Sequence, residues 1–239
     1  MDVALFHCRP SYQQHSPTKG GAMAIHAARL TDSRCSRRLS AVLASAFAHD
    51  PLFRIECPDQ TSVEGMRRET ERELESIILR SALSSTNNAS VWAAIDRSTG
   101  QIVGFARWKH ADQHPTKAGG DPGAADPFTL PGSAPELYGR LSTGKKKTLM
   151  GLRPFHCLEV LAVDPQAQGR GMGSMLVNTF RETATKAPVY CEANVLALPF
   201  YQKIGFEILD SFSVTLPDTE KGVGGQIYET YCLKLDHAT

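Results

Sequence analysis

The stretch Gln168-Gly169-Arg170-Gly171-Met172-Gly173 follows an apolar run, Cys157 to Val163, and opens an amphipathic segment. This order predicts a strand, a glycine-rich turn and a helix. The free N–H groups at a helix start, together with the helix dipole, bind an anion such as pyrophosphate. Glycine suits this turn because a Cβ atom would hold the anion away from the N–H groups or clash where φ is positive. The stretch therefore predicts a phosphate-binding turn.

Two other kinds of glycine-rich turn use the same physics. Dinucleotide sites have the spacing GxGxxG, and P-loops have GxxxxGK[ST]. Here the glycines have neither spacing, no Lys-Ser or Lys-Thr pair follows them, and the turn lies late in the chain. Both alternatives are therefore disfavoured.

A second motif lies downstream of the turn. The pattern N-x-x-A-x-x-[hydrophobic]-Y-x-x-x-G-F is matched at every specified position by Asn194, Ala197, Phe200-Tyr201 and Gly205-Phe206. This motif occurs together with Val163-Asp164-Pro165 and with the QxxGxG spacing that begins at Gln168. In these features the sequence resembles the GNAT superfamily of acyl-CoA N-acyltransferases. The resemblance implies an α/β (α+β) GNAT fold, in which helices flank a central mixed, mostly antiparallel sheet with splayed strands 4 and 5.

The resemblance also implies acetyl-CoA as the cosubstrate, without a metal. The backbone N–H of Leu161 would stabilise the oxyanion, and Val163 would bond the pantetheine arm. The residues implied to bind acetyl-CoA are Leu161, Ala162, Val163, Gln168, Gly169, Arg170, Gly171, Met172, Gly173, Ser174 and Asn194.

Tyr201 is implied by the same resemblance to be the general acid that protonates the leaving thiolate. A phenol has a pKa of about 10, so it stays protonated at pH 7 and can donate to the sulfur. The alternative interpretation is an aromatic side chain that packs with Phe200 and Phe206.

The acceptor needs a base, because a primary ammonium resembles lysine, with a pKa of roughly 10.4. Glu159 is the first candidate. Strand alternation places it on one face with Cys157, and a carboxylate between Leu158 and Val160 in an apolar strand needs an explanation. The alternatives are a Glu159 that only pairs with a nearby Arg, and Glu192 of the facing strand as the base.

The order of elements around the turn is that of the GNAT fold. Apolar periodicity predicts strands at 23–30, 91–95, 102–108, 189–193, 206–216 and 227–235, and helices at 32–48, 63–83, 171–186 and 195–204. Between 109 and 154 the composition changes to Pro, Gly, Ala, Asp and Lys. We interpret this as an insertion with a short helix at 135–141, either functional or disordered. The basic run Lys145 to Lys147 is interpreted as a solvated face.

Length and composition predict a single domain over 23–239, preceded by an N-terminal tail at 1–22. The chain has 239 residues, of which 41% are hydrophobic, and this suffices for one core. A net charge of +1 disfavours nucleic acid as a partner. No apolar run approaches the roughly 20 residues of a membrane helix. The six scattered cysteines and the absence of a signal-like start favour reduced thiols and a cytoplasmic protein.

The predicted function is transfer of the acetyl group of acetyl-CoA to the amine of a small molecule, by direct attack in a ternary complex. Ala46 to Pro51 and Leu198 to Tyr201 resemble small-molecule acetyltransferases of the puromycin N-acetyltransferase type. Met150 to Pro154 resembles fungal relatives of that type. The alternatives are a protein or peptide N-acetyltransferase and a non-catalytic CoA-binding domain, and we expect a monomer or a homodimer.

Overall fold

The computed structural model describes residues 12–13, 25–83, 89–110, 134–151, 154–218 and 225–236. These residues fall into two compact units by their contacts. The first unit takes in 1–47, 63–109 and 160–184, and the second takes in 48–62, 110–159 and 185–239. The predicted single domain over 23–239 stays a prediction.

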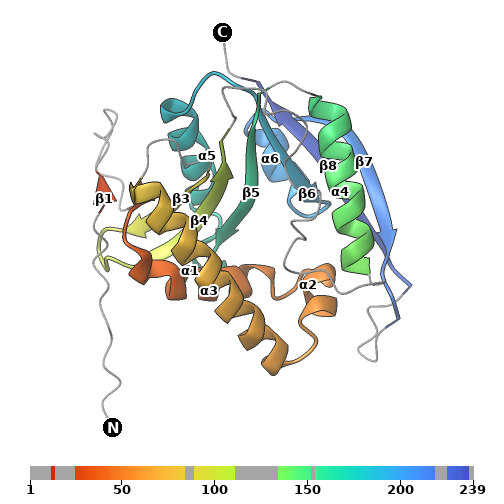
Figure 1. Ribbon diagram of the computed structural model, residues 1–239, viewed down its shortest axis with the longest axis horizontal. Coiled ribbons are helices and arrows are strands. Elements are labelled where there is room, and N and C mark those ends of the chain that lie inside the picture. The colour runs from red at the N-terminus through yellow and green to blue at the C-terminus, as the bar shows by residue number, and fades with distance from the viewer. Residues whose placement is uncertain are drawn as a thin grey trace. The chain divides into compact units, whose positions relative to one another are not determined.

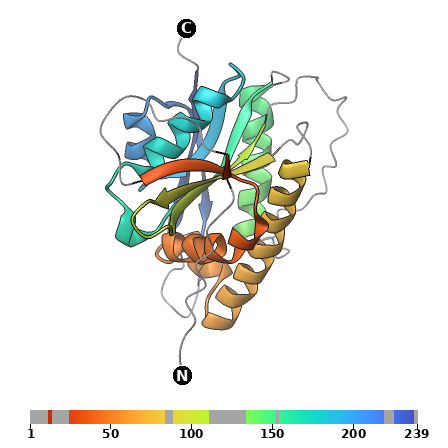
Figure 2. The same ribbon diagram turned by 90° about the vertical axis from the view of Figure 1, so that its left-hand side faces the viewer.

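The first unit contains an antiparallel sheet with helices packed against it (Figures 1 and 2). Its strand order is β1-β2-β3-β4-β5. The strands are β1 (Tyr12–Gln13), β2 (Ile25–Leu30), β3 (Ala89–Asp96), β4 (Ile102–Lys109) and the end of β5 (His156–Val163). The helices are η1 (Ser33–Cys35), α1 (Ser36–Phe47), α3 (Gln60–Leu83), η2 (Pro165–Ala167) and α5 (Met172–Thr183). The strand β1 lies within the predicted N-terminal tail, whose other residues are outside the described part.

The helices of this unit bury apolar faces against its sheet. Helix α3, the long orange-to-yellow helix of Figure 2, buries a single face through Met66, Thr70, Leu74 and Ile78, which recur every four residues. Helix α5 packs on β2, β3 and β4. There the Phe180 ring stacks on the ring of Trp108, with centroids 3.7 Å apart. This stacking anchors the helix that begins at the glycine-rich turn.

The second unit contains the strands that follow the turn. Its strand order is β5-β6-β8-β7, with β6 (Val189–Asn194), β7 (Glu207–Thr215) and β8 (Ile227–Leu235). The pairs β6–β8 and β7–β8 are antiparallel, whereas β5–β6 is parallel. The helices are α2 (Pro51–Glu56), α4 (Ala134–Met150) and α6 (Leu198–Lys203). Helix α4 lies alongside β7 (Figure 1).

The parallel pairing of β5 with β6 is short. It comprises His156 with Val189, Cys157 with Tyr190, and Leu158 with Cys191. Beyond Leu158, residues 159–163 of β5 have no described pair on β6, and the rest of β6 pairs with β8 alone. The mixed, mostly antiparallel sheet and this interrupted parallel pair are those of the predicted GNAT fold, which is confirmed.

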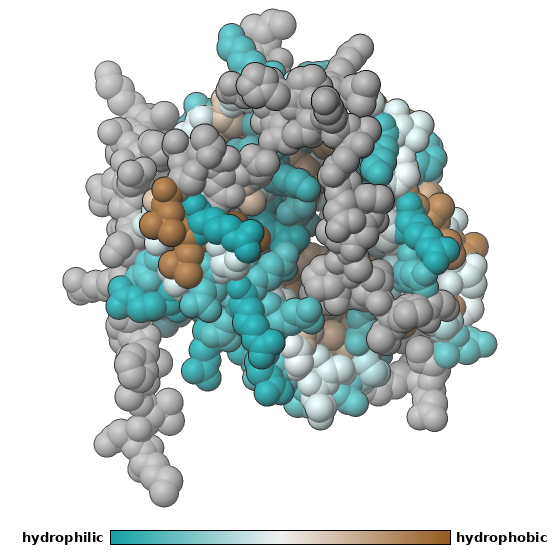
Figure 3. All heavy atoms as spheres, in the orientation of Figure 1, coloured by the Kyte–Doolittle hydropathy of each residue, from teal (hydrophilic) through white to brown (hydrophobic). Residues whose placement is uncertain are grey.

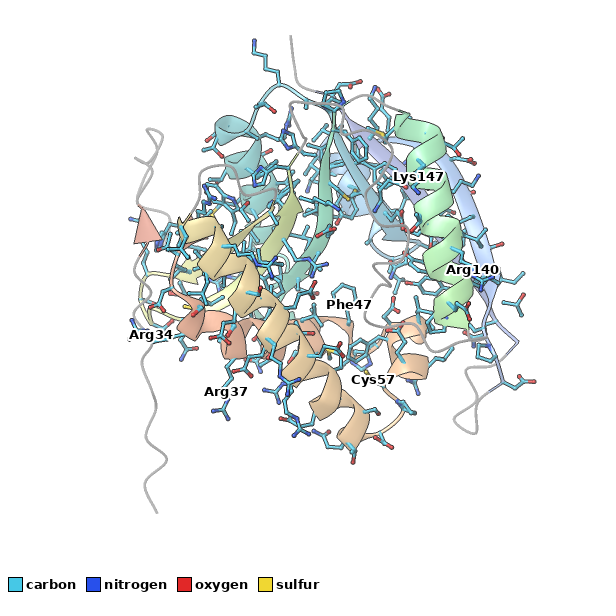
Figure 4. All side chains as sticks on the ribbon, viewed as in Figure 1. Arg34, Arg37, Phe47, Cys57, Arg140 and Lys147 are labelled. Carbon is cyan, nitrogen blue, oxygen red and sulfur yellow. The ribbon has the colours of Figure 1, made fainter. Side chains whose placement is uncertain are left out.

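The helix in the segment predicted to be an insertion is longer than expected. A short helix was expected at 135–141, but α4 continues to Met150 and includes the whole lysine run. Lys145 forms an ion pair with Asp210 in which both side chains are partly exposed, so the interpretation of the run as a solvated face stays a prediction. Lys147, labelled with Arg140 on α4 in Figure 4, is exposed as expected. The insertion's residues 111–133 and 152–153 lie outside the described part.

On the face shown in Figure 3, hydrophobic residues form small separate patches between hydrophilic ones. Among the described residues, no helix is both long and apolar enough to cross a membrane.

Candidate functional site

The glycine-rich turn has the backbone that its sequence predicts. Gly169 and Gly171 have φ angles of +73° and +80°, which L side chains rarely adopt. A Cβ atom added to either residue would meet nothing within 4 Å. The turn therefore leaves open space above its backbone, where a Cβ atom would stand in the way of a ligand. Gly173 lies within α5 and does not have a positive φ.

The start of α5 is open to an anion. Its N-cap is Gly171, which supplies no side-chain cap, so the N–H groups of the first turn lack the usual side-chain acceptor. Arg170 beside them is exposed, Met172 is buried, and Ser174 is half-buried. A helix start of this kind offers N–H donors and a positive partial charge, which together suit pyrophosphate.

The strand that leads into the turn is held firmly. The Gln168 side chain donates from Nε2 to the carbonyl of Val163 at 3.1 Å, which ties the turn back to β5. Asp164 caps η2 and accepts from Arg38 Nη2 at 2.9 Å, and Arg38 Nε donates to the carbonyl of Ile102. The predicted oxyanion-stabilising Leu161 is half-buried on the same strand, next to the buried Ala162. The residues of the first unit that are predicted to bind acetyl-CoA thus form one continuous segment, and hydrogen bonds hold it to β4, α1 and β5.

Glu159 is exposed on β5. The argument from an unexplained carboxylate in a buried strand therefore fails, because water solvates this side chain. Its role as the base stays a prediction.

Three side-chain hydroxyl groups hold the Glu192 carboxylate by hydrogen bonds. Its Oε1 accepts hydrogen bonds from Ser142 Oγ at 2.8 Å and from the Tyr190 hydroxyl at 2.9 Å, and its Oε2 accepts from the Tyr138 hydroxyl at 3.1 Å. Burial is the main cause that raises the pKa of both tyrosines, and the Glu192 charge raises it further. Both phenols therefore remain hydrogen-bond donors at neutral pH. The second unit holds this carboxylate in one orientation.

Asn194, expected to contact acetyl-CoA, is engaged inside the second unit. Its Nδ2 donates to Asp50 Oδ2 at 2.7 Å, and its Oδ1 accepts from the N–H of Ala197 at 2.9 Å. Asp50 also accepts from the Tyr228 hydroxyl at 2.9 Å and caps α2. The Asn194 side chain thus joins β6, α2 and the turn before α6, and its contact with acetyl-CoA stays a prediction.

Tyr201 lies on α6 and is 6% exposed. Its ring makes edge contacts with Phe200 and Phe206, at centroid distances of 5.0 and 5.2 Å. The packing interpretation is thus correct, and it does not exclude the acid role. Burial raises the pKa of the phenol well above its usual value, and nearby Cys191 adds to this effect. The hydroxyl therefore stays protonated over the whole physiological range.

Sequence reasoning missed Tyr138, Ser142 and Asp50. The first two lie one helical turn apart on α4, in the segment interpreted as an insertion. Their spacing and the apolar positions Leu141 and Leu149 were the available signal for a helix that faces the sheet. That signal was weak, because glycine and threonine have a low helix propensity and the lysine run interrupts the apolar spacing.

Comparisons with known proteins agree with this geometry. Residues 137–208 match the acetyltransferase (GNAT) domain family, so the match begins within α4. No curated protein matched the chain. One similar solved structure is a histone acetyltransferase HPA2 and related acetyltransferase from Corynebacterium glutamicum, at 22% identity and a TM-score of 0.56, covering 91% of this chain and 98% of that one.

Two further solved structures show the same fold. The Drosophila melanogaster polyamine N-acetyltransferase has 18% identity and a TM-score of 0.55, with 89% of this chain and 100% of that one covered. The PaiA N-acetyltransferase from Thermoplasma acidophilum, in complex with coenzyme A, has 14% identity and a TM-score of 0.53, with 90% and 100% covered. The glycine turn, the interrupted β5–β6 pair and the similar solved structures lead to one conclusion: the chain has the GNAT fold, and its residues 137–208 match the acetyltransferase (GNAT) domain family.

Proposed function

We propose that the chain is an acetyl-CoA-dependent N-acetyltransferase that transfers the acetyl group directly to the amine of a small molecule. One observation carries the proposal. The turn with positive φ at Gly169 and Gly171 precedes an uncapped α5, within a segment that matches the GNAT acetyltransferase domain. Open backbone N–H groups at this place suit the pyrophosphate of acetyl-CoA.

Residues of the first unit would hold acetyl-CoA. The N–H groups at the start of α5 would bind its pyrophosphate, and the exposed Arg170 adds a positive charge beside them. Residues 159–163 of β5 have no described pair on β6, so the backbone of Leu161 and Val163 fits the roles of donor to the thioester carbonyl and to the pantetheine arm.

Tyr201 is the proposed acid for the leaving sulfur. Its raised pKa keeps the phenol neutral, which is the form that donates a hydrogen bond. The same rise makes complete proton transfer to a thiolate, whose conjugate acid has a pKa of about 8.5, more unfavourable. We therefore assign to Tyr201 a hydrogen bond that stabilises the developing negative charge on sulfur.

A small-molecule acceptor is supported by the resemblance of Ala46 to Pro51 and Leu198 to Tyr201 to enzymes of the puromycin N-acetyltransferase type. The test is release of free CoA, measured with a thiol reagent, from acetyl-CoA and a panel of acceptors. The panel holds benzylamine, 1,4-diaminobutane, and peptides with a free N-terminus or a lysine.

Turnover on a small amine but not on the peptides is the expected result. Turnover on peptides alone would replace the small molecule by a polypeptide acceptor. Binding of CoA, measured by calorimetry, without turnover on any member of the panel would refute the proposed catalysis and leave a CoA-binding domain.

A further inference from the structure

Asp50 is a buried carboxylate of the second unit, with 9% of its surface exposed. Its Oδ1 accepts from the backbone N–H groups of Leu52 at 2.9 Å and Phe53 at 3.1 Å, in the first turn of α2. Its Oδ2 accepts from Asn194 Nδ2 at 2.7 Å and from the Tyr228 hydroxyl at 2.9 Å. A carboxylate accepts about four hydrogen bonds in total. These contacts fill that capacity, so Asp50 can influence a reaction only through the groups that it holds.

The contact with Asp50 determines which way the Asn194 amide points. An ionised carboxylate only accepts hydrogen bonds, so it must face the NH2 group of the amide, and the amide oxygen then faces the other way. There Asn194 Oδ1 accepts from the N–H of Ala197 at 2.9 Å. An amide with its oxygen and nitrogen exchanged would oppose two donors at Ala197 and two acceptors at Asp50. The carboxylate of Asp50 thus selects one orientation of the Asn194 side chain.

Ala197 is the N-cap of α6, the short helix that carries Tyr201. Its carbonyl accepts from the N–H of Tyr201 at 3.3 Å. The helix has 6 residues, and a helix shorter than about 12 residues is marginal by itself, so contacts at its ends fix its position. The Asn194 side chain supplies such a contact at the start of the helix. The backbone of Tyr201 is therefore held by a chain of hydrogen bonds that leads back to Asp50.

We propose that Asp50 is a positioning residue for Tyr201, and that it acts through the Asn194 amide and the start of α6. The inference rests on the proposed function, in which the Tyr201 hydroxyl donates a hydrogen bond to the leaving sulfur. Misplacement of a reacting group by about 1 Å can lower a rate about one hundred-fold, even when the changed residue lies far from the chemistry. Tyr228 on β8 holds the same oxygen of Asp50 as Asn194 does, so the chain of contacts is anchored in the sheet as well as in α2.

An exchange of the two side chains tests the contact between Asp50 and Asn194. Asp50→Asn leaves one oxygen for both the α2 backbone and the Asn194 NH2 group, so one of these contacts is lost. Asn194→Asp places two carboxylates against each other. The exchange variant, which carries Asp50→Asn together with Asn194→Asp, reverses donor and acceptor: the new NH2 group faces the new carboxylate, whose other oxygen still accepts from Ala197. Each single change should therefore be harmful, and the exchange variant should regain the contact.

The first measurement is kcat of the full-length chain at saturating acetyl-CoA, with the amine of the panel that turns over fastest. Asp50→Asn should lower kcat about five- to thirty-fold, and the exchange variant should return to within about three-fold of the wild type. Asp50→Ser should lower kcat similarly, because its hydroxyl still caps α2 but offers no second oxygen to Asn194. Asp210→Asn is the matched control: it removes another polar contact of the second unit without touching α6, so kcat should stay within about two-fold.

Combination with Tyr201→Phe separates positioning from general destabilisation. If Asp50 acts through the Tyr201 hydroxyl, Asp50→Asn should change kcat less than about two-fold once that hydroxyl is absent. A merely structural role would instead lower kcat by the same factor in both backgrounds. Equal losses in the two backgrounds, a wild-type kcat in Asp50→Asn, or no recovery in the exchange variant would each overturn the proposal.

A second measurement does not require turnover. In the full-length chain labelled with fluorotyrosine and saturated with CoA, the fluorine resonance that disappears in Tyr201→Phe reports the surroundings of that ring. This resonance should shift in Asp50→Asn, return in the exchange variant and stay unchanged in Asp210→Asn. Such a shift in a protein that releases no CoA with any amine would support the positioning role and refute the transferase. A resonance that Asp50→Asn leaves unchanged would overturn the positioning role, whether or not the wild type is active.

Discussion

A Cβ atom in the glycine turn should have two effects: it strains the backbone, and it obstructs the bound ligand. Replacement of Gly171 by alanine allows each effect to be measured by itself. With φ at +80°, an alanine at this position is strained by about 1–2 kcal/mol, because its Cβ approaches the following carbonyl. No atom lies within 4 Å of the added Cβ, so steric contact with the rest of the protein adds nothing. Gly171→Ala should therefore lower the free energy of unfolding by about 1–2 kcal/mol and leave the protein folded.

Gly65→Ala is the matched control for this change. Gly65 lies inside α3, also has nothing within 4 Å of an added Cβ, and does not have a positive φ. The same methyl group should therefore stabilise the protein, by about 0.5–1 kcal/mol, through a better helix propensity. The two variants should move stability in opposite directions.

Urea unfolding followed by tryptophan fluorescence measures both variants in the relevant part of the chain. The protein has two tryptophans, Trp92 and Trp108, and both lie in the first unit with Gly65 and Gly171. Trp108 is in direct contact with Phe180 of α5, the helix that begins after Gly171. The fluorescence signal therefore reports on the packing of this helix.

Calorimetry with CoA measures the second effect. The alanine Cβ of Gly171→Ala would enter the open space above the turn, so CoA affinity should fall at least ten-fold, while Gly65→Ala should bind CoA as the wild type does. A destabilised Gly171→Ala that binds CoA normally would show that the anion site is misassigned. An undestabilised Gly171→Ala would refute the strain argument.

Three further predictions concern other parts of the chain. Tyr201→Phe should lower kcat ten-fold or more and leave acetyl-CoA affinity nearly intact, since only the hydroxyl is removed; an unchanged rate across pH 6 to 9 would contradict its role. Gly104→Ala should destabilise the first unit by about 1–3 kcal/mol in the same urea assay, because the new Cβ would lie 3.0 Å from the carbonyl oxygen of Ala162; wild-type stability would show that β4 adjusts freely. Stability should fall between pH 9 and 11, because burial raises the pKa of the Cys57 thiol (Figure 4) from 9.0 to about 11 in the folded protein. In this range the unfolded chain releases the thiol proton and the folded chain keeps it, so rising pH favours unfolding. If thermal unfolding of Cys57→Ala has the same pH dependence as the wild type, other groups cause the loss.

The glycine turn and the motif that includes Tyr201 were predictable because their chemistry is local. A positive φ, an open helix start and an aromatic residue at fixed spacing depend on neighbours within a few positions. The apolar periodicities of α1, α3 and α5 were equally clear, because each helix buries one face through residues three or four positions apart.

The sequence alone determined the fold class and the position of the glycine-rich turn, since both depend on spacing along the chain. Only the tertiary structure decided which carboxylate is held in place: Glu159 is exposed, whereas Glu192 accepts from Tyr138 and Ser142, which are 54 and 50 residues away along the chain. It also showed that Asn194 bonds Asp50, a partner 144 residues away. Such contacts arise from strand pairing and helix packing, so no local pattern of residue types specifies them.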